Sequence, residues 1–500
     1  MASPQSQLGL LEAGFQSLTL NPSPQVQSLF DAGLKSLTLA PFNARYKQRE
    51  ESYWSNTAKL RPACIVVPQS AQEVAAALKA IVRAGHKFAV RSGGHTSTAG
   101  SNNIKDGVTI DLSELNTVSY DAASGLANIG PGAVWRAVYK TLSSHGVTVA
   151  GGRAGDVGVG GLLLGGGKSF FTGGHGFACD NVVAYEIVLG SGDIITASQE
   201  QHMELFQALK GGNNNFGIVT RFTMNTIKCQ EVWGGLALLT RETIPAVLSA
   251  IVNFTSNTRR DPDSNLVSII THSPQTQGTS VVMYWAQVAG NAQSPAYHEL
   301  RTIPQVMNTM EITSHQELAD GFSLPAGLYN IWYTLTVKND VRMMAEASRL
   351  HDELVDKLRT HMPDGNFTTQ CVLQPLPKLY AERSEARGGN SLGLERHQQD
   401  GVLVLLTAML RTQGQTEFAG PKMQEWFESL QAYGKQIDGL LPWVYLNYAH
   451  ATQSPLASYG RESVERMRRV AREYDPQGVF QTLCPGGFKI SNVRDEDVSP

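Results

Sequence analysis

The chain has 500 residues, of which 42% are apolar and 17% are charged, a balance typical of a folded protein with a sizeable core. This length allows two or three domains. The 41 basic and 44 acidic side chains leave a net charge of -3, so no strong field attracts nucleic acid or an acidic membrane surface, and we expect neither as a partner.

The first forty residues contain a duplicated phrase and no recognisable secretory signal. Residues 11–22 and 30–41 share the pattern Ala-Gly-x-x-Ser-Leu-Thr-Leu-x-Pro. Two copies are too few for a solenoid, so we interpret them as amphipathic turns that pack on the outside of the main body, with a docking segment as the alternative. Because no positively charged stretch precedes an apolar one, we expect a cytoplasmic protein.

A βαβ unit is predicted next. Residues 63–67 form an apolar strand, Ser70 and Glu73 fit a helix capping box, and residues 74–84 have helical apolar spacing. Residues 87–91 form a second strand, which runs directly into a loop with the sequence Ser-Gly-Gly-His.

Strands at residues 108–112 and 127–129 and a helix at 133–144 lead to a glycine-rich segment. Residues 151–176 hold 12 glycines in 26 positions, against an average of about 7%. Neither a P-loop nor a Rossmann fingerprint fits, because leucine stands where each motif needs a glycine. Successive N–H groups in such turns bind anions, so this segment and residues 91–97 could each hold part of the pyrophosphate of a large cofactor.

Beyond about residue 229 the pattern changes to longer apolar and aromatic strands that alternate with helices. The clearest strands are at 280–285, 329–334 and 401–410, and the last is about half as long as a membrane span, so it is interpreted as a buried strand. The pattern is typical of an α+β domain on an antiparallel sheet. A further strand is predicted near Trp443, and a closing helix at about 461–474.

The five cysteines are scattered, odd in number and never spaced Cys-x-x-Cys. This argues against a disulfide framework and against a zinc site. No cluster of His, Cys and Asp ligands is recognisable either, so the sequence shows no motif for metal-dependent chemistry.

Five motifs occur in an order typical of one family. They are Arg91-Ser-Gly-Gly-His95, the glycine run 158–167, Asp180-Asn181-Val182, Phe216-Gly-Ile-Val-Thr220 and Tyr445-x-Asn447-Tyr448. The chain resembles the FAD-linked oxidases with the p-cresol-methylhydroxylase-type flavin fold, of the vanillyl-alcohol-oxidase superfamily, and in particular the berberine-bridge-enzyme-like branch. The ending at residues 474–489 is most similar to fungal members that serve natural-product pathways. The middle of the chain matches in layout only.

The resemblance implies an α+β protein with a two-part FAD-binding domain and an inserted substrate domain. We expect an N-terminal extension at 1–56, the FAD-binding domain at 57–230, the substrate domain on an antiparallel sheet at 231–440, and a C-terminal segment at 441–500 that returns to the FAD-binding domain. The flavin would lie in the cleft between the two domains.

His95 matches the histidine that is attached covalently to the 8α methyl group of FAD in this family. A neutral imidazole nitrogen can add to an oxidised flavin tautomer, and the link makes the flavin a stronger oxidant. The alternative is a histidine that only hydrogen-bonds the cofactor. Relatives with a second link have a cysteine where this chain has Ala154, so a single covalent link is expected. Cys179 is interpreted as a small buried hydrophobe.

The resemblance also assigns contacts with FAD to residues in the matching motifs. The alternative is glycine-driven turn geometry without a ligand. His175 lies in the glycine-rich segment and is expected to be structural or at the rim of the pocket, with substrate contact as the alternative. The matching cofactor residues are Arg91, Ser92, Gly93, Gly94, Thr96, Asp156, Val157, Gly158, Gly161, Asn181, Ile218 and Asn447.

Tyr448 matches the tyrosine that takes a proton from the substrate in relatives while hydride leaves for the flavin. A phenol in water ionises only near about pH 10, so it needs a nearby positive charge or hydrogen-bond donors, and the sequence shows no such helper. On a regular strand Tyr445 and Tyr448 would lie on opposite faces. Two alternatives therefore remain: Tyr445 is the base, or no tyrosine acts as a base.

We expect an FAD-linked oxidoreductase that oxidises a small organic substrate of secondary metabolism, with or without ring formation. Dioxygen is expected to reoxidise the flavin and to give hydrogen peroxide. The alternatives are a dehydrogenase with another acceptor, a cyclase that uses the flavin as a scaffold, and a binding protein without chemistry, which would not need His95. Neither the substrate nor the oligomeric state is encoded in a recognisable motif.

Overall fold

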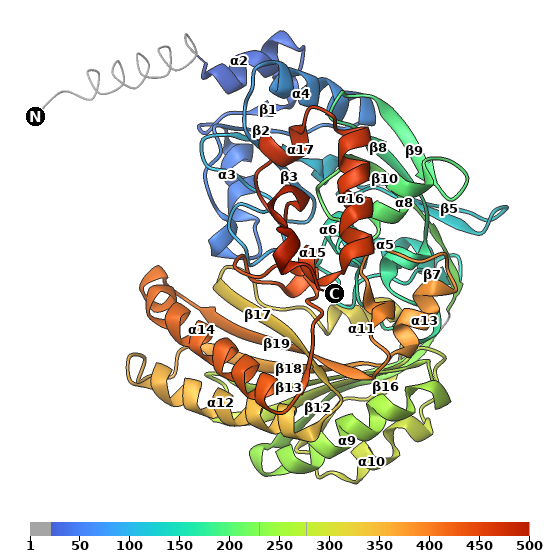
Figure 1. Ribbon diagram of the computed structural model, residues 1–500, viewed down its shortest axis with the longest axis vertical. Helices are drawn as coiled ribbons and strands as arrows, with labels where there is room; N and C mark the ends of the chain where they lie inside the picture. Colours follow the sequence, from blue (N-terminus) through green and yellow to red (C-terminus); the bar gives the residue numbers. More distant parts are fainter. Residues whose placement is uncertain (1–21, 230, 277, 500) are drawn as a thin grey trace, which may run out of the picture.

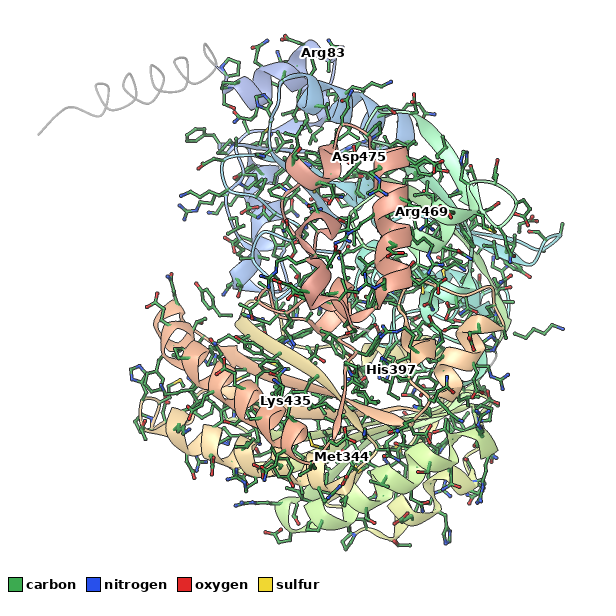
Figure 2. The ribbon with its side chains drawn as sticks, in the orientation of Figure 1. Arg83, Met344, His397, Lys435, Arg469 and Asp475 are labelled. Carbon is green, nitrogen blue, oxygen red and sulfur yellow. The ribbon has the colours of Figure 1, made fainter. Side chains whose placement is uncertain are left out.

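The computed structural model describes residues 22–229, 231–276 and 278–499 and has two lobes (Figure 1). The loop lobe contains three small sheets and both ends of the described chain, and the sheet lobe contains one nine-stranded sheet covered by long helices. Arg83 lies in the loop lobe, Met344 among the helices of the sheet lobe, and His397 near their junction (Figure 2). The mixed architecture confirms the predicted α+β class.

The first sheet of the loop lobe confirms the predicted βαβ unit. Strands β2 (Cys64–Val66) and β3 (Phe88–Arg91) are both parallel to β4 (Val108–Asp111), which lies between them. Helix α4 (Ala71–Arg83) connects β2 to β3, and β1 (Thr38–Leu39) pairs with β2 at the edge.

Helix α4 begins at the predicted capping box, where the Ser70 side chain accepts a hydrogen bond from the Glu73 N–H. Its apolar face packs on the sheet and against α2 (Pro24–Asp31). The second copy of the duplicated phrase runs from the end of α2 through a 3₁₀ turn at Lys35–Leu37 into β1, so it supplies the edge strand of this sheet instead of packing outside the main body as turns alone. Residues 11–21 of the first copy lie outside the described residues.

The second sheet of the loop lobe is antiparallel and carries the larger core of this lobe. Its strands, in sheet order, are β5 (Val118–Asp121), β6 (Leu126–Ile129), β10 (Ile218–Asn225), β8 (Val182–Val188) and β9 (Ile194–Ser198). A two-stranded sheet pairs β7 (Val147–Thr148) with β11 (Ile227–Lys228). The helices of this lobe are α3 (Ala44–Glu51), α5 (Trp135–Ser143), α6 (Val159–Leu164), α7 (Thr172–His175), α8 (Met203–Leu209), α15 (Pro455–Ser458), α16 (Arg461–Tyr474) and α17 (Val479–Thr482).

The C-terminal segment returns to the loop lobe, as the red ribbon of Figure 1 shows. Helix α16 spans the predicted residues and buries Val464, Met467 and Val470 in the larger core of this lobe. A chain segment far from the N-terminal motifs in sequence thus completes the core beneath them.

The sheet lobe confirms the expected antiparallel sheet. Its strands, in sheet order, are β15 (Met307–Asn308), β12 (Val232–Thr240), β14 (Thr279–Gln287), β13 (Ser264–His272), β18 (Thr368–Leu376), β19 (Gly401–Leu410), β17 (Tyr329–Lys338) and β20 (Leu440–Leu441), and β16 (Glu311–Thr313) also pairs with β12. Helices α9 (Ile244–Asn257), α12 (Val341–Arg359) and α14 (Gln413–Gln436) cover its outer face, and the shorter helices of the lobe are α10 (His298–Thr302), α11 (His315–Asp320) and α13 (Leu379–Glu385).

The two faces of this sheet have different partners, because side chains alternate along each strand. Residues such as Met283 and Trp285 of β14 face the helices. The opposite face, here called the inner face, carries an apolar cluster that also contains Trp54 of the loop lobe. The buried residues of the inner face are Val267, Ile269, Trp332, Val372 and Leu405.

The predicted strand near Trp443 is wrong. The chain leaves the sheet after the two residues of β20, and Leu446–Tyr448 form a 3₁₀ turn in which the Tyr448 N–H donates to the Tyr445 carbonyl oxygen at 3.0 Å. A 3₁₀ helix has about three residues per turn, so residues three apart lie on the same side. Tyr445 and Tyr448 therefore meet edge to face at 4.9 Å, instead of pointing to opposite faces.

No helix in the described part of the chain is long and apolar enough to cross a bilayer. Among the same residues, no group of three or more His, Cys, Asp or Glu side chains could hold a metal ion. All five cysteines are free thiols, and Cys179 is buried in the larger core of the loop lobe.

Candidate active site

The two glycine-rich loops lie back to back. A Cβ atom added to Gly93 would lie 2.6 Å from the Gly158 Cα, and one added to Gly158 would lie 2.4 Å from the Gly93 nitrogen. Only glycine allows backbones to approach this closely. Ser92 joins the same loops, because its Oγ donates to the Pro131 carbonyl oxygen and accepts from the Gly160 N–H at 3.2 Å.

Arg91 braces the first loop from behind. Its side chain is 1% exposed, Nη1 donates to the Arg49 carbonyl oxygen, and Nη2 donates to the Ser52 Oγ. The Asp111 carboxylate lies 3.8 Å from Nη1. Protein groups therefore occupy most of the Arg91 guanidinium, which leaves little of it for the predicted contact with a pyrophosphate. Its Nε is a buried donor without a partner among the described residues.

His95 is held against Trp54. The two rings stack with their centres 4.2 Å apart and a 14° angle between their planes, and the backbone N–H of Trp54 donates to the Gly94 carbonyl oxygen. Burial lowers the pKa of His95 to about 4, although the Asp156 carboxylate acts in the opposite direction. The imidazole is therefore neutral at physiological pH, and its buried Nε2 has no hydrogen-bond partner among the described residues.

Four of the buried polar atoms without partners among the described residues lie in or beside these loops, and they provide a test of whether a cofactor fits. Besides the His95 Nε2 and the Arg91 Nε, they include one carboxylate oxygen of Asp156 and the amide oxygen of Asn181. Native proteins leave few such atoms, and those at a ligand site are satisfied by the ligand. A neutral histidine, unpaired polar atoms and close-packed glycine backbone together fit a large phosphorylated cofactor.

The other predicted cofactor residues lie in the same two loops or directly beneath them. Val157 holds the start of α5 through its carbonyl oxygen, which accepts from the Trp135 N–H. The Asn181 amide donates to the carbonyl oxygens of His175 and Phe177. The remainder comprise Gly94 with φ +74°, Thr96, whose Oγ1 accepts from the Thr98 N–H, Gly161, at which an added Cβ would meet no atom within 4 Å, and the buried Ile218 at the start of β10.

Tyr448 has the helper that the sequence did not reveal. Its Oη accepts from the Arg153 Nη2 at 3.0 Å and from the Gln374 Nε2 at 3.3 Å. Arg153 comes from the glycine-rich segment, Gln374 from β18, and Trp332 of β17 packs edge to face against the Tyr448 ring at 5.7 Å. The phenol oxygen thus faces a cation and two N–H donors, which is the environment that a phenolic base requires.

Tyr445, the alternative base, is committed to the backbone of the loop lobe. Its side chain is 2% exposed, and its Oη accepts from the Lys168 N–H at 2.9 Å and from the Asn447 amide at 3.2 Å. Burial raises the pKa of Tyr445 above its usual value. Asn447 also donates to the Leu162 carbonyl oxygen and so ties the C-terminal turn to the glycine run.

His175 belongs to a separate polar cluster. Its Nδ1 lies 2.9 Å from the Arg387 Nη2, and its pKa is lowered to about 4 by burial and by the charges of Arg387 and Arg383. These partners support the expectation that His175 is structural.

An aromatic chain links His95 to Tyr448 across the two lobes. Trp54 stacks on His95, Trp332 meets Trp54 at 5.4 Å, and Tyr448 meets Trp332 at 5.7 Å. Sequence reasoning missed Trp54, Trp332, Arg153 and Gln374. A charged residue inside the glycine-rich segment is the one available signal, and Arg153 shares it with Asp156 and Lys168.

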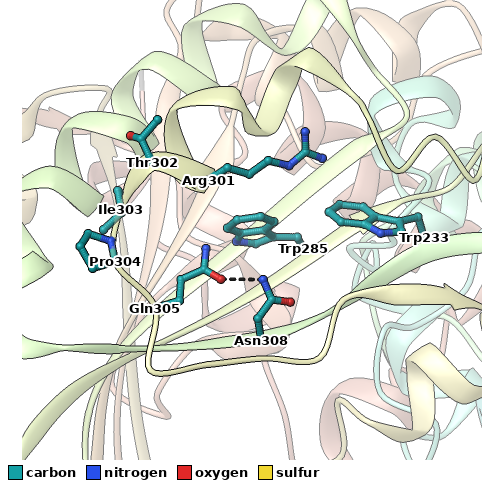
Figure 3. Close-up of a pocket in the computed structure, with 8 residues that line it drawn as sticks. All are labelled: Trp233, Trp285, Arg301, Thr302, Ile303, Pro304, Gln305 and Asn308. Carbon is teal, nitrogen blue, oxygen red and sulfur yellow. Dashed lines mark hydrogen bonds between the residues drawn. The ribbon is translucent and has the colours of Figure 1, made fainter.

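A pocket lies elsewhere in the structure. It has a volume of about 400 Å³ and is lined on the outer side of the sheet lobe by Trp233, Trp285, Arg301, Thr302, Ile303, Pro304, Gln305 and Asn308 (Figure 3). Trp285 belongs to the helix-facing side of the sheet, opposite the inner face. This pocket therefore has no contact with His95 or Tyr448 and is not the active site.

Comparison with known proteins shows the family to which the chain belongs. The FAD binding domain family matches residues 62–198, which contain both glycine-rich loops. Together with the two-lobed fold, this match defines an FAD-dependent oxidoreductase. The chain is 37% identical over 457 residues to the FAD-dependent monooxygenase sdcF of Emericella nidulans, covering 91% of this chain and 95% of that protein. It is 34% identical over 473 residues to the FAD-dependent monooxygenase drtC of Aspergillus calidoustus, covering 93% and 90%. The chain belongs to this family of FAD-linked oxidoreductases.

Solved structures share the fold at lower sequence identity. 6-Hydroxy-D-nicotine oxidase from Arthrobacter nicotinovorans superposes with a TM-score of 0.74 at 23% identity, covering 89% of this chain and 96% of that chain. Glucooligosaccharide oxidase from Acremonium strictum, described as carrying a 6-S-cysteinyl, 8α-N1-histidyl FAD, has a TM-score of 0.69 at 20% identity, covering 86% and 92%. The p-cresol-methylhydroxylase-type, berberine-bridge-enzyme-like flavin fold inferred from the motifs is thereby confirmed.

Proposed function

We propose that this enzyme oxidises a small, mostly apolar organic molecule, with FAD attached covalently through His95 alone and with Tyr448 as the base. The observation that carries the proposal is the aromatic chain from His95 through Trp54 and Trp332 to Tyr448. It brings the residue proposed to hold the flavin and the residue proposed to take the proton to one side of the inner face.

The residues of the loop lobe are suited to hold the cofactor. FAD, when bound, supplies a hydride acceptor whose electrons can pass on to dioxygen with release of hydrogen peroxide. His95 offers a neutral imidazole for the covalent link, and Trp54 fixes the plane of the imidazole ring. Backbone N–H groups of the two joined loops would bind the pyrophosphate. Ala154 has no nucleophile, so a second link through that position is not expected.

Tyr448 would take the proton of the substrate hydroxyl or amine as the hydride leaves the neighbouring carbon. Arg153 and Gln374 each donate a hydrogen bond to its oxygen, at 3.0 and 3.3 Å. Arg153 also donates to the Gln374 amide oxygen at 2.6 Å, which holds the two donors together. A positioned base of this kind contributes about 10²- to 10⁴-fold to the rate.

The inner face indicates the class of substrate. Val267, Ile269, Trp332 and Leu405 give this face an apolar and aromatic surface beside Tyr448, with Tyr284 and Phe322 at its margin. Such a surface excludes water and binds flat, apolar molecules. We therefore propose a substrate with an apolar body and one hydroxyl or amino group directed at Tyr448.

The first test is an absorbance spectrum of purified protein followed by acid precipitation, with His95→Ala as the variant and the exposed His145→Ala as the control. We expect yellow flavin to stay with the precipitate in the wild type and in the control only. A wild type whose colour is released by acid would contradict the covalent link, and a colourless protein would contradict FAD binding.

The second test separates oxidation from oxygen insertion, the second candidate, which is favoured by the names of the monooxygenase relatives. Substrate oxidation is followed under isotopically labelled dioxygen, with peroxide measured in parallel. The proposal predicts one peroxide for each product and no label in the product. Label in the product would favour monooxygenation, and turnover only with an artificial acceptor would favour a dehydrogenase.

A further inference from the structure

The duplication at the start of the chain extends beyond residues 11–22 and 30–41. Residues 3–7 and 23–27 share the pattern Ser-Pro-Gln-x-Gln. With one extra residue in the first copy, the chain therefore begins with two versions of one segment, here called copy 1 (3–22) and copy 2 (23–41). The structure describes copy 2 in full, whereas residues 3–21 of copy 1 lie outside the described residues.

Copy 2 docks on a surface formed by α4 and β2 of the loop lobe. Its helix α2 begins at Ser23, whose side chain accepts a hydrogen bond from a backbone N–H of the first turn. Val26 and Leu29 of α2 are buried in the core that this helix shares with α4. The chain then turns at Gly33, which has a φ of +80° that side-chain-bearing residues rarely adopt.

The end of copy 2 pairs with the free edge of β2. Leu39 of β1 lies opposite Ile65, and the Val67 N–H donates to the Leu37 carbonyl oxygen at 2.9 Å. The Leu39 side chain is 3% exposed and packs with Tyr46, Ile65 and Val67. Because β4 occupies the other edge of β2, only one strand at a time can bind here.

Copy 1 carries the residue types that this surface requires. It has a glycine where the turn needs one and apolar side chains at most of the positions that copy 2 buries. Leu10, Gly14, Phe15, Thr19 and Leu20 stand where copy 2 has Leu29, Gly33, Leu34, Thr38 and Leu39.

Two differences favour copy 2 in the intact chain. Ser6 stands in place of the buried Val26, and Gly9 lies in the stretch that matches α2, where glycine disfavours a helix. Docking of copy 1 would also leave residues 23–41 as a loop. The entropy cost of closing a loop grows only slowly with its length, so this cost weakens the docking of copy 1 without excluding it.

We propose that copy 1 is a second docking segment for the surface formed by α4 and β2 of its own chain, and that it takes this place when copy 2 is released. The two copies adjoin in sequence, so copy 1 is present at high effective concentration beside the surface that copy 2 leaves. The exchange preserves the edge strand of the sheet whose strand β3 runs into the first glycine-rich loop.

The test is a double-variant cycle in the full-length holoenzyme. Leu39→Asn places a polar group at the buried position of copy 2, and Leu20→Asn makes the same change in copy 1. We expect no effect of Leu20→Asn and only a small fall of the urea midpoint and the FAD content in Leu39→Asn. The two changes together should lower both quantities by more than the sum of the single effects. Additive effects would overturn the inference.

Cleavage by trypsin after Lys35 reports which copy is docked. Lys35 belongs to copy 2, and copy 1 has Gln16 at the matching position. Cleavage of a segment that opens and closes rapidly follows the population of its open form. We expect cleavage after Lys35 to be about ten-fold faster or more in Leu39→Asn, while the FAD content stays near that of the wild type. Fast cleavage accompanied by loss of FAD would show that copy 1 does not replace copy 2.

A second pair of variants covers the case in which copy 2 of Leu39→Asn stays docked. Gly33→Val opposes the positive φ at the turn, and Gly14→Val is its counterpart in copy 1. The same coupling and the same cleavage after Lys35 are expected, and a second pair without coupling would overturn the inference.

The matched control is Val138→Asn in α5, a fully buried position of the loop lobe outside both copies. Its effect should add to that of Leu20→Asn without coupling, and coupling there would mean that Leu20→Asn acts on the whole fold. Light scattering and a dilution series identify the chain on which copy 1 docks. Rescue that requires high protein concentration would assign copy 1 to a second molecule and overturn docking within one chain.

Discussion

The two lobes contribute to the proposed active site in different ways. The loop lobe uses backbone, with glycines packed closer than any side chain would allow and polar contacts that lock one loop onto the other. The sheet lobe uses side chains, which project from regular strands onto the inner face. If the proposed function holds, the difference teaches that cofactor binding depends on short local motifs, whereas substrate recognition depends on side chains from several strands.

The largest expected effect is that of a methyl group between the two loops. Gly158→Ala places a Cβ atom 2.4 Å from the Gly93 nitrogen, which forces the loops apart at a cost of about 3 kcal/mol or more. We expect less than about a tenth of the wild-type FAD content, measured by visible absorbance. Gly420→Ala in α14 is the matched control in the sheet lobe, since an added Cβ there meets no atom within 4 Å. Native FAD content in Gly158→Ala would show that the loops have room to move.

The next effect concerns the contact between the lobes and its dependence on pH. His315 of α11 is buried against Tyr139 of α5 at 4.0 Å, and burial lowers its pKa to about 3. Below about pH 6.5 the unfolded chain therefore binds a proton that the folded chain does not. Stability falls as the pH drops through this range, by up to about 3 kcal/mol at pH 4.

Chemical denaturation of wild type, His315→Gln and the exposed His361→Gln at a series of pH values measures this effect. The profile of His315→Gln should be flatter than that of the wild type on the acidic side, and that of His361→Gln should follow the wild type. Equal acid sensitivity in all three would mean that His315 is protonated in the folded protein.

A smaller effect should separate the two faces of the large sheet. Trp332→Leu removes an indole from the inner face and should raise KM by about ten-fold, or about 1.4 kcal/mol, with unchanged FAD content. Trp233→Leu removes an indole from the helix-facing side and should lower stability without a change in KM. Steady-state kinetics and thermal denaturation of both variants provide the comparison. Similar KM values for the two variants would remove the inner face from the substrate site.

The smallest effect is one in which the lobes should behave alike. Ser70 caps α4 in the loop lobe and Thr412 caps α14 in the sheet lobe, each through a hydrogen bond to a backbone N–H. Replacing either by alanine should cost about 1 kcal/mol of folding free energy and leave activity unchanged. Urea denaturation measures the cost, and a loss of activity in either variant would show that the cap also supports the site.

The loop lobe was largely predictable from sequence, because its signals are local. The capping box at Ser70, the strand that runs into the His95 loop and the glycine run each depend on neighbouring residues. They sufficed to predict the α+β class, the FAD-linked family and the cofactor. The roles assigned to His95, to Tyr448 and to the individual FAD contacts remain predictions.

The remaining residues of the site could not be found in this way. Gln374 and Trp332 look like ordinary strand residues, and only the register of β18 and β17 brings them to Tyr448. The C-terminal strand was wrongly predicted because apolar and aromatic residues near Trp443 fit a strand, while the chain instead forms a tight turn whose Tyr445 hydroxyl is anchored on Lys168. Tertiary hydrogen bonds of this kind are absent from any local pattern.

A short stretch before the matched FAD domain has a consequence for where the functional unit begins. Ser52 holds Arg91, Trp54 holds His95, and Ser55 and Asn56 bond to residues 328 and 330 at the start of β17. The domain match starts only at residue 62. A protein cut or recombined at that boundary would inherit both glycine loops and yet lose the tether that sets them against the inner face. The part of the chain needed to build the proposed site therefore begins before residue 62, where the family match starts.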